Sequence, residues 1–293
     1  MSKQFDEKYE EYLNYFNDEL TKYCDENFKT TPDILGESMR YSVLLGGKRI
    51  RPVLMFAVGE VLGVDKQKLL PFAIALELIH TYSLIHDDLP EMDDDDYRRG
   101  KPSNHKVYGQ GNAVLAGDGL LNSAYSLLLG ECFKGSEYVN AAKYICDCAG
   151  IFGMIAGQSA DLLYENAQPD EDTLNFIYEN KTAKLIMAAV VLPSIFKSGE
   201  SFSELQAFGK ILGYLFQLTD DILDVCGKFS HTGKSIGKDD AAGKMSAVRL
   251  YGLADCKLRA DMVGDDCLKI IDGLNGDCTF LYEFINFVKS RLG

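Results

Sequence analysis

Apolar residues near the beginning of the chain recur at steps of three and four. Phe5, Tyr9, Leu13, Phe16 and Leu20 follow this spacing, and Glu, Asp and Lys fill most positions between them. Because an α-helix has 3.6 residues per turn, these side chains share one helical face. The pattern therefore predicts an amphipathic helix that packs one side on a core.

Four later segments are apolar over most of a helical circumference, as is typical of helices inside a large bundle. They are residues 69–86, 113–129, 173–191 and 203–225. Alternating runs joined by Asn-Gly turns, the usual mark of hairpins, do not occur. No linker rich in Ser, Gly or Pro divides the chain. The sequence predicts an all-α fold with a single domain over residues 1–293.

Charge and composition exclude several classes of protein. The chain has 30 Lys and Arg against 44 Asp and Glu, a formal net charge of −14, which gives no electrostatic basis for binding nucleic acid. The first residues carry charges of both signs and do not form a signal peptide. The longest uncharged apolar run, residues 185–196, is too short to span a membrane. We expect no integral membrane segment.

The eight cysteines are scattered, with no C-x-x-C pair and no zinc-like spacing. A chain of 293 residues buries a large core and needs no disulfides to fold. We therefore expect buried free thiols and a reducing cytoplasm as the compartment.

A first acidic cluster, HDDLPEMDDDDYRRG, spans residues 86–100. It follows an apolar helix directly, which would place Asp87 and Asp88 at the mouth of a core. Pro90 cannot continue a regular helix, so we expect the chain to bulge and to bring Asp93 back to the same mouth. An EF-hand is a poor alternative, because the required Gly and Glu are absent. The remaining aspartates, 94–96, are expected to be mainly solvated or supporting.

A second acidic cluster, FQLTDDILD, spans residues 216–224. Gln217, Asp220 or Asp221, and Asp224 are spaced so that they share one helical face. Carboxylates on a mostly apolar helix are costly to bury unpaired. Two such clusters, each at the end of an apolar helix, favour carboxylates that hold hard divalent cations, and Mg²⁺ suits that role.

Basic residues accompany both clusters. The segments that follow them, 97–112 and 226–246, lack an apolar period and are expected to be surface loops. A P-loop is excluded, since GKSIGKDD does not have the required frame and no strand precedes it. Metals held by aspartates on one side and cations on the other describe a clamp for a diphosphate. The cations are Lys48, Arg49, Arg51, Arg98, Arg99, Lys101, Lys234, Lys238 and Lys244.

Seven motifs, in order and spacing, resemble those of the trans-polyprenyl diphosphate synthase family, with bacterial-type farnesyl diphosphate synthases the nearest type. The resemblance covers nearly the whole chain and is far more specific than an isolated DDxxD. It implies the isoprenoid synthase fold, a helical bundle around a central deep cavity. The motifs are GGKRIRP (46–52), LIHTYSLIHDDLPEMDDDDYRRGKPSNH (78–105), AGDGLL (116–121), GQSADL (157–162), KTAKL (181–185), FQLTDDILD (216–224) and GKSIGKDDAAGK (233–244).

The resemblance also implies substrate-binding roles. A histidine on an apolar helix is more often a core residue, but His80 lies two turns before Asp87 on the same face, which favours a role in binding. The resemblance places isopentenyl diphosphate on Lys48, Arg51, His80 and Arg99. It places the allylic diphosphate on Arg98, Lys181 and Lys234, and it turns Thr182 and Gln217 toward the reacting allylic carbon; Arg98, Lys181, Thr182 and Gln217 are the predicted catalytic residues.

The metal ligands follow from the same resemblance. Asp87 and Asp93 are the expected ligands of the first motif, with Asp88 in support. Asp220 is the expected ligand of the second motif, completed by Asp221 and Asp224. The resemblance implies about three Mg²⁺ ions per site when substrate is bound, with Mn²⁺ as an alternative.

The implied reaction condenses isopentenyl diphosphate with dimethylallyl and then geranyl diphosphate, giving farnesyl diphosphate. The allylic C–O bond ionises, the double bond of isopentenyl diphosphate attacks the cation, and a proton is lost. Tyr82 and Ser83 lie one turn before the first motif, and the large Tyr82 ring is the expected floor that limits the product to fifteen carbons.

Other functions compete with this interpretation. A geranylgeranyl diphosphate synthase would differ in the residue at the floor. A non-catalytic partner subunit would lose an aspartate motif, whereas this chain keeps both, and a terpene cyclase would lack GGKRIRP and Arg99. An acidic Mg²⁺- or Ca²⁺-binding protein without catalysis is the remaining alternative. A homodimer is expected from the resemblance alone.

Overall fold

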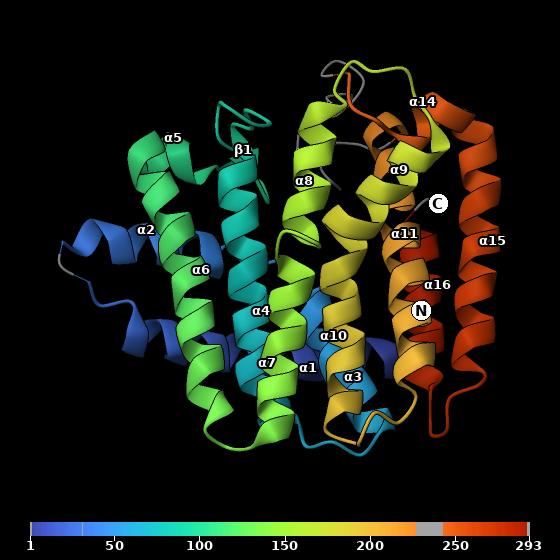
Figure 1. The fold of residues 1–293 in the computed structure, drawn as a ribbon, viewed down its shortest axis with the longest axis horizontal. Coiled ribbons are helices and arrows are strands. Elements are labelled where there is room, and N and C mark those ends of the chain that lie inside the picture. Colours follow the sequence, from blue (N-terminus) through green and yellow to red (C-terminus); the bar gives the residue numbers. More distant parts are fainter. Residues whose placement is uncertain (1, 31, 227–242, 292–293) are drawn as a thin grey trace.

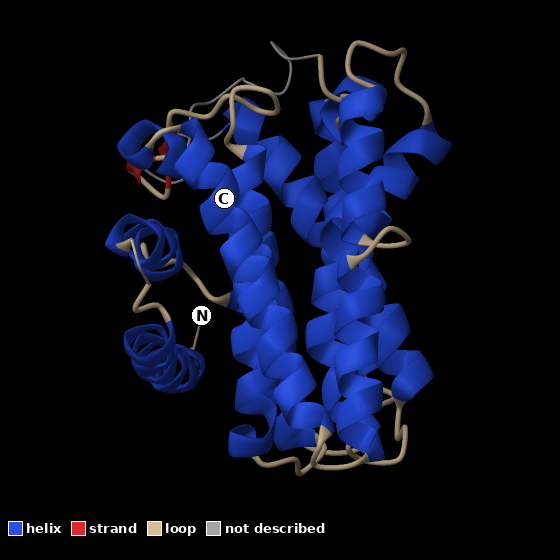
Figure 2. Cartoon of the chain, turned by 60° about the vertical axis from the view of Figure 1, so that its left-hand side comes forward, coloured by secondary structure: helices blue, strands red, loops and turns tan. Residues whose placement is uncertain are grey.

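A computed structural model describes residues 2–30, 32–226 and 243–291, and these are almost entirely helical (Figures 1 and 2). The predicted all-α fold is confirmed. The elements are α1 (Lys3–Asn27), α2 (Asp33–Leu44), α3 (Ile50–Val61), α4 (Lys66–Asp87), β1 (Tyr97–Arg98), β2 (Lys101–Pro102), α5 (Asn104–Tyr108), α6 (Gln110–Cys132), α7 (Ser136–Ala149), α8 (Met154–Leu163), α9 (Glu171–Ile177), a π-helix (Tyr178–Ala183), α10 (Lys184–Ile195), α11 (Phe202–Cys226), α14 (Ala247–Tyr251), α15 (Leu253–Ile271) and α16 (Thr279–Ser290).

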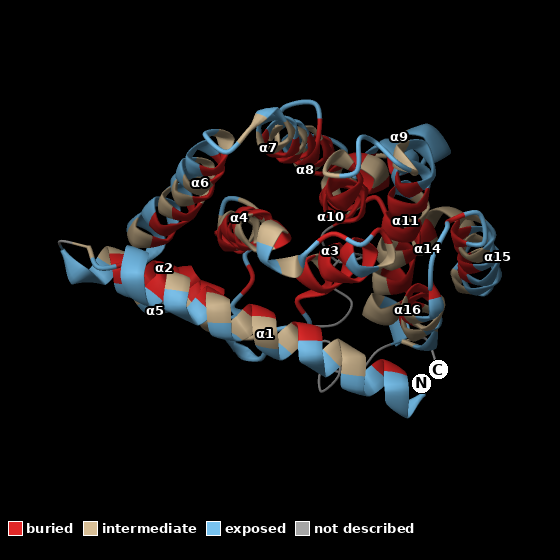
Figure 3. Cartoon of the chain, turned by 90° about the horizontal axis from the view of Figure 1, so that it is seen from below, coloured by how far each residue is buried: buried red, intermediate tan, exposed pale blue. Residues whose placement is uncertain are grey.

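Of the helices that were expected to be apolar on most sides, α4 and α10 lie in the middle of the bundle. The prediction is wrong for α6, which buries one stripe and leaves Leu115 and Leu129 exposed. Helices α4 and α10 are buried along most of their length, and α3 lies between α4 and α11 (Figure 3). Helix α1 packs one face, including Phe16 and Leu20, on this core and leaves the other in solvent. Its Ser2 side chain accepts a hydrogen bond from the Phe5 N–H, which caps the helix. The amphipathic pattern at the beginning of the chain is thus confirmed.

Two predictions of local structure need correction. Residues 173–191 do not form one α-helix, because the π-helix Tyr178–Ala183 interrupts it between α9 and α10. Residues 97–112 are not a plain loop either. They form a two-stranded antiparallel hairpin, the short helix α5 and the beginning of α6. The residues next to the two strands continue the pairing, since the Ser103 N–H donates to the Asp96 carbonyl.

Two stretches of the described residues are long and apolar enough to cross a membrane by length and composition alone. They are Lys66–Asp87, which is α4, and Ser136–Leu163, which contains α7 and α8. The first is mostly buried inside the bundle, as core helices of soluble proteins also are. The finding is therefore weak support for a membrane segment.

All eight cysteines lie in described parts of the chain and are free. Five are buried, as predicted, but Cys132 and Cys146 are half-buried and Cys226 is exposed. Burial raises the pKa of the Cys24 thiol to about 12, so that this thiol stays protonated. The expected free thiols are confirmed, and their complete burial is not.

Candidate functional site

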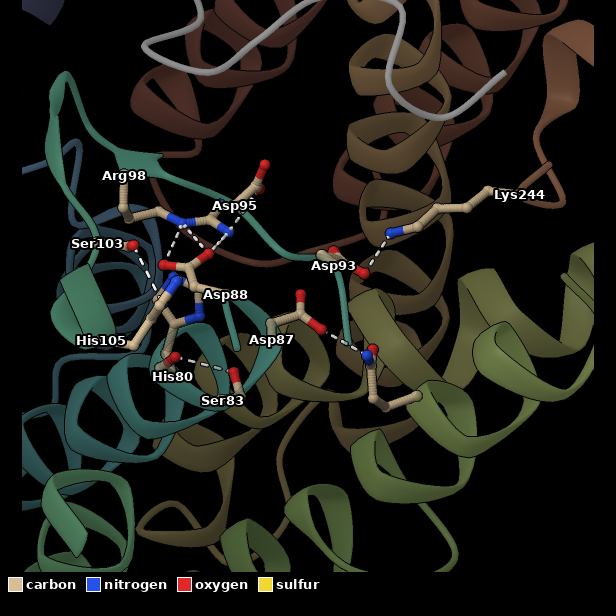
Figure 4. Close-up of polar contacts among 11 residues, drawn as sticks. His80, Ser83, Asp87, Asp88, Asp93, Asp95, Arg98, Ser103, His105 and Lys244 are labelled. Atoms are coloured by element: carbon tan, nitrogen blue, oxygen red, sulfur yellow. Dashed lines mark hydrogen bonds and ion pairs between the residues drawn. The ribbon is translucent and has the colours of Figure 1, made fainter. Parts of the chain in front are cut away.

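The first aspartate motif forms where α4 ends. Asp87 is the last helical residue, and the chain then turns back so that the Asp93 N–H donates to the Asp87 carbonyl at 2.9 Å (Figure 4). The Asp95 N–H donates in the same way to the Asp88 carbonyl. These bonds bring Asp93 beside Asp87, as the proline at position 90 predicts. The Asp87 carboxylate accepts a hydrogen bond from the Gln158 amide of α8.

Asp88 and Arg98 form a buried ion pair behind this motif. Arg98 Nε donates to Asp88 Oδ1 at 2.9 Å, and its NH2 group also lies 3.3 Å from Asp95. Both side chains are less than a tenth exposed. The pair fixes the β1–β2 hairpin against the end of α4 (Figure 4). The structure thus joins two residues that were predicted to act separately, on metal and on diphosphate.

Two lysines face the first motif from other elements. Lys181 Nζ donates to Asp161 Oδ2 at 2.5 Å, and Lys244 Nζ donates to Asp93 Oδ1 at 2.6 Å. Burial lowers the pKa of Lys181, but the charges of Asp87, Asp161 and Asp93 outweigh it and raise that pKa. Lys181 thus pairs with Asp161 and also feels the negative charge of the first motif. Sequence reasoning gave Asp161 no role, although it lies in the GQSADL motif.

Close packing explains the π-helix that carries Lys181 and Thr182. A Cβ on Gly157 of α8 would lie 2.0 Å from the Lys181 nitrogen, and one on Gly213 of α11 would lie 2.3 Å from the Ala183 Cβ. Both glycines therefore let neighbouring helices approach the π-helix backbone. Lys181 bonds α8, whereas Thr182 Oγ1 donates to Gln217 Oε1 of α11 at 2.7 Å.

The second aspartate motif lies on the last turns of α11. Asp220 is paired with Arg291, near the end of α16, whose guanidinium also covers the Phe216 ring. Asp221 points the other way and is buried, and Asp224 is half-buried. Of the two aspartates that the spacing allowed on the face of Gln217, the structure selects Asp221, which accepts a hydrogen bond from the Gln217 amide. The predicted cation Lys234 lies outside the described residues.

A short segment connects the two motifs. Lys244 donates to Asp93 of the first motif, and three residues later the Ala247 N–H donates to Asp221 Oδ2 at 2.7 Å. The two motifs consequently lie on either side of residues 244–247.

A cluster of cations lies around Glu77 and His80 on α4. Arg49 NH1 donates to Glu77 Oε1 at 2.7 Å, and Arg99 NH2 lies 3.9 Å from the same oxygen. Both arginines have positive φ, a backbone conformation that is strained for residues other than glycine and that is often found at functional sites. Burial lowers the pKa of His80, and the charges of Arg51 and Arg99 lower it further, so this imidazole stays neutral. Sequence reasoning missed Glu77, the counter-ion of the cluster.

Further predicted residues complete this cluster. Burial lowers the pKa of Arg51, whose Nε is buried and has no hydrogen-bond partner among the described residues. Burial also lowers the pKa of Lys48, and Arg291 adds to the effect. Burial is the main reason that the pKa of Arg99 falls to about 10. Burying several positive charges together costs free energy, and such a cluster indicates a binding site for an anionic ligand.

The donor set suits Mg²⁺. Asp87 and Asp93 converge where α4 ends. Asp220 lies on α11 beside Asp221, the residue of the second motif that contacts Ala247. Each of these carboxylates contacts a donor or a cation, namely Gln158, Lys244 and Arg291. Carboxylate oxygens are the ligands that Mg²⁺ takes in combination with phosphates and water. The residues present therefore fit the metal that the sequence predicts.

Tyr82 lies one turn before the first motif. It is 6% exposed, and its ring meets the His86 ring edge-on with centroids 5.7 Å apart. Burial raises the pKa of Tyr82 to about 12. The neighbouring Ser83 donates to the His80 carbonyl at 2.9 Å, so its hydroxyl is used within α4. Of these two residues, Tyr82 is the one whose side chain is large enough to block a growing product tail.

Comparisons with known proteins agree with this site. Residues 32–270 match the model of the polyprenyl synthetase family. The chain is 41% identical over 268 residues to a farnesyl diphosphate synthase of Bacillus subtilis, covering 89% of this chain and 90% of that protein. It is also 41% identical over 249 residues to a chloroplastic geranylgeranyl pyrophosphate synthase of Capsicum annuum, covering 83% of this chain and 68% of the relative.

A solved structure is similar along its whole length. It is the geranyltransferase of Helicobacter pylori complexed with magnesium and isoprenyl diphosphate, with a TM-score of 0.86 and 33% sequence identity. The match covers 100% of this chain and 98% of that one. This chain therefore shares the fold of that geranyltransferase.

Proposed function

The chain belongs to the polyprenyl synthetase family, and from this premise we propose that it makes farnesyl diphosphate. It condenses isopentenyl diphosphate with dimethylallyl diphosphate and then with geranyl diphosphate, as a prenyltransferase of isoprenoid biosynthesis. The observation that carries this proposal is the pair of aspartate motifs on either side of residues 244–247, with cations on both. Neither a cyclase nor a non-catalytic subunit needs this arrangement together with the cluster around Glu77 and His80.

The allylic diphosphate binds between the two motifs. Lys181 and Lys244 there exchange their carboxylate partners for phosphate oxygens, and Lys234 is proposed to join them. Arg98 stays paired with Asp88 and positions the hairpin. Asp87, Asp93 and Asp220 hold Mg²⁺, with Asp88 and Asp224 in support. When bound, Mg²⁺ supplies positive charge against the charge that grows on the departing diphosphate.

Isopentenyl diphosphate binds on the cluster around Glu77 and His80. Lys48, Arg51 and Arg99 supply the charge, and neutral His80 supplies a hydrogen bond. Thr182 and Gln217 present oxygens to the positive carbon that forms when the allylic C–O bond breaks. The bundle keeps water away from that carbon. About three Mg²⁺ ions per site are proposed, and Mn²⁺ is proposed as a substitute.

Tyr82 sets the length of the product. We expect wild-type enzyme, given isopentenyl and geranyl diphosphates, to release mainly a fifteen-carbon product, because the Tyr82 ring blocks further growth of the tail. Tyr82→Ala removes the ring and should make a twenty-carbon product dominant. Chromatography and mass spectrometry of the alcohols after phosphatase treatment measure both. The matched control Tyr144→Ala removes a half-buried ring of α7 that packs against Phe202, and it should leave fifteen carbons dominant.

Wild-type enzyme that forms no prenyl product would contradict the proposed function. Wild-type enzyme that makes mainly a twenty-carbon product would assign the chain to the geranylgeranyl type, with one member of which it shares 41% identity over 249 residues. An unchanged product in Tyr82→Ala would remove Tyr82 as the floor and leave the prenyltransferase activity intact.

We further propose that the protein is a homodimer. Large apolar side chains are exposed along α6 and at its end, where Leu129 is 66% and Phe133 is 94% exposed. Exposed apolar side chains in such a row are typical of an interface. Light scattering after size exclusion should give twice the mass of one chain, and Leu129→Glu together with Phe133→Glu should give the mass of one. A monomeric wild type would rule the dimer out.

The reaction is proposed to take place in a reducing cytoplasm. Eight free cysteines, with one of them exposed, support this compartment, because an oxidising one favours their pairing. Fractionation of cells that make the protein would test it.

A further inference from the structure

A buried hydrogen-bond network surrounds Asp221. Tyr178 Oη donates to Asp221 Oδ2, and the Ala247 N–H donates to the same oxygen at 2.7 Å. Gln217 Nε2 donates to Asp221 Oδ1 at 3.0 Å. Asp221 is 3% exposed and Tyr178 is 1% exposed. Within the described part of the chain the carboxylate thus receives these three donors in the core, which is how a buried charge is stabilised.

This network determines which way the Gln217 amide points. The amide nitrogen must face Asp221, because its oxygen there would meet a carboxylate that cannot donate. The amide oxygen therefore faces the π-helix, where Thr182 Oγ1 donates to it at 2.7 Å. As a result, the lone pairs of the Thr182 oxygen stay available to another group.

Tyr178 holds Asp221 in place from the same π-helix that carries Thr182. The two residues are four positions apart and both face α11. Burial raises the pKa of Tyr178, and the negative charge of Asp221 raises it further, so the phenol remains a donor at every physiological pH. The π-helix and α11 are therefore linked twice, once through each end of the network.

Asp220 differs from Asp221 in its burial and in its partners. Its side chain is 40% exposed, and Arg291 is the partner that is described for it. A metal ion could reach Asp220 after Arg291 moves. At Asp221 the same ion would have to displace buried donors from two elements.

We propose that Asp221 is a positioning residue rather than a metal ligand, and that Tyr178 fixes it so that Gln217 and Thr182 present their oxygens to the reacting allylic carbon. The inference rests on the proposed function, because it assigns the substrate carbon to that site. It adds Tyr178 to the residues that control the reaction. It also gives the two adjacent aspartates of the second motif different tasks.

Steady-state kinetics with geranyl and isopentenyl diphosphates test the network. Tyr178→Phe should lower kcat by about 10-fold and Asp221→Asn by about 100-fold, which are the sizes expected when preorganised dipoles lose their orientation. The KM values and the Mg²⁺ concentration for half-maximal rate should stay within about 2-fold. Because Tyr178 acts through Asp221, the double variant should be no slower than Asp221→Asn alone.

Tyr214→Phe is the matched control. The Tyr214 ring packs against the Tyr178 ring with centroids 5.0 Å apart, so this variant also removes one hydroxyl from the same aromatic pair. Its hydroxyl is not among the contacts of Asp221 described above, and kcat should stay at the wild-type value.

Several outcomes would overturn the inference. A 10-fold or larger rise in the Mg²⁺ requirement of Asp221→Asn would make Asp221 a metal ligand. An unchanged kcat in Tyr178→Phe, or additive losses in the double variant, would separate Tyr178 from catalysis. Should Asp221→Asn not fold, Tyr178→Phe alone decides, because it leaves the carboxylate in place. An inactive wild type would instead contradict the proposed function.

Discussion

Asp87→Asn should lower kcat by about 10³-fold. The variant keeps the shape of the side chain but removes a carboxylate charge from the first motif, where Asp93 and Asp161 also gather around Lys181. Positive charge held by this motif stabilises the negative charge on the departing diphosphate. The loss of such stabilisation lowers kcat by this order of magnitude. Initial rates at saturating substrates measure it, together with a Mg²⁺ titration.

Glu91→Gln is the control for Asp87→Asn. Glu91 is exposed in the same return loop, so this variant also removes one negative charge near the first motif. Its kcat should stay within about 2-fold of wild type, since exposed charges are screened by water and salt. Near-normal turnover of Asp87→Asn at ordinary Mg²⁺ would contradict the role given to Asp87.

The fold could be predicted because its helices differ in how much of their surface is exposed to solvent. An amphipathic helix such as α1 shows its buried face as a period, and α4 shows by its composition that it is buried on most sides. The return of Asp93 to Asp87 could be predicted as well, because Pro90 forces a break at a known position. These features depend on residues that are close together in the chain.

Features that depend on distant residues could not be predicted. The π-helix at residues 178–183 forms where Gly157 and Gly213 let two other helices approach, and a local period cannot show this. Adjacent Asp220 and Asp221 look equivalent in the sequence, but neighbouring positions on a helix point about 100° apart, so one is buried and one is half-exposed. The partnership of Arg49 with Glu77 joins two helices and leaves no local signal.

That partnership leads to the largest expected effect on stability. Glu77→Ala should lower the free energy of unfolding by about 3–5 kcal/mol, because it leaves the Arg49 guanidinium buried without its counter-ion. The two side chains are 1% and 2% exposed, so water cannot replace the carboxylate. Urea unfolding followed by circular dichroism measures the change.

The same substitution should raise the KM for isopentenyl diphosphate more than that for geranyl diphosphate. Arg99 lies 3.9 Å from Glu77, so the loss of this carboxylate removes a contact that positions one of the cations proposed to hold isopentenyl diphosphate. Glu60→Ala is the control, because the Glu60 side chain is 61% exposed, so that water can replace it at both Lys8 and the Tyr12 hydroxyl. Exposed ion pairs of this kind contribute up to about 1 kcal/mol. If Glu77→Ala proved as stable as Glu60→Ala, the charge of Arg49 would have found another partner. An equal rise in both KM values would mean that Glu77 supports the whole bundle rather than the isopentenyl site.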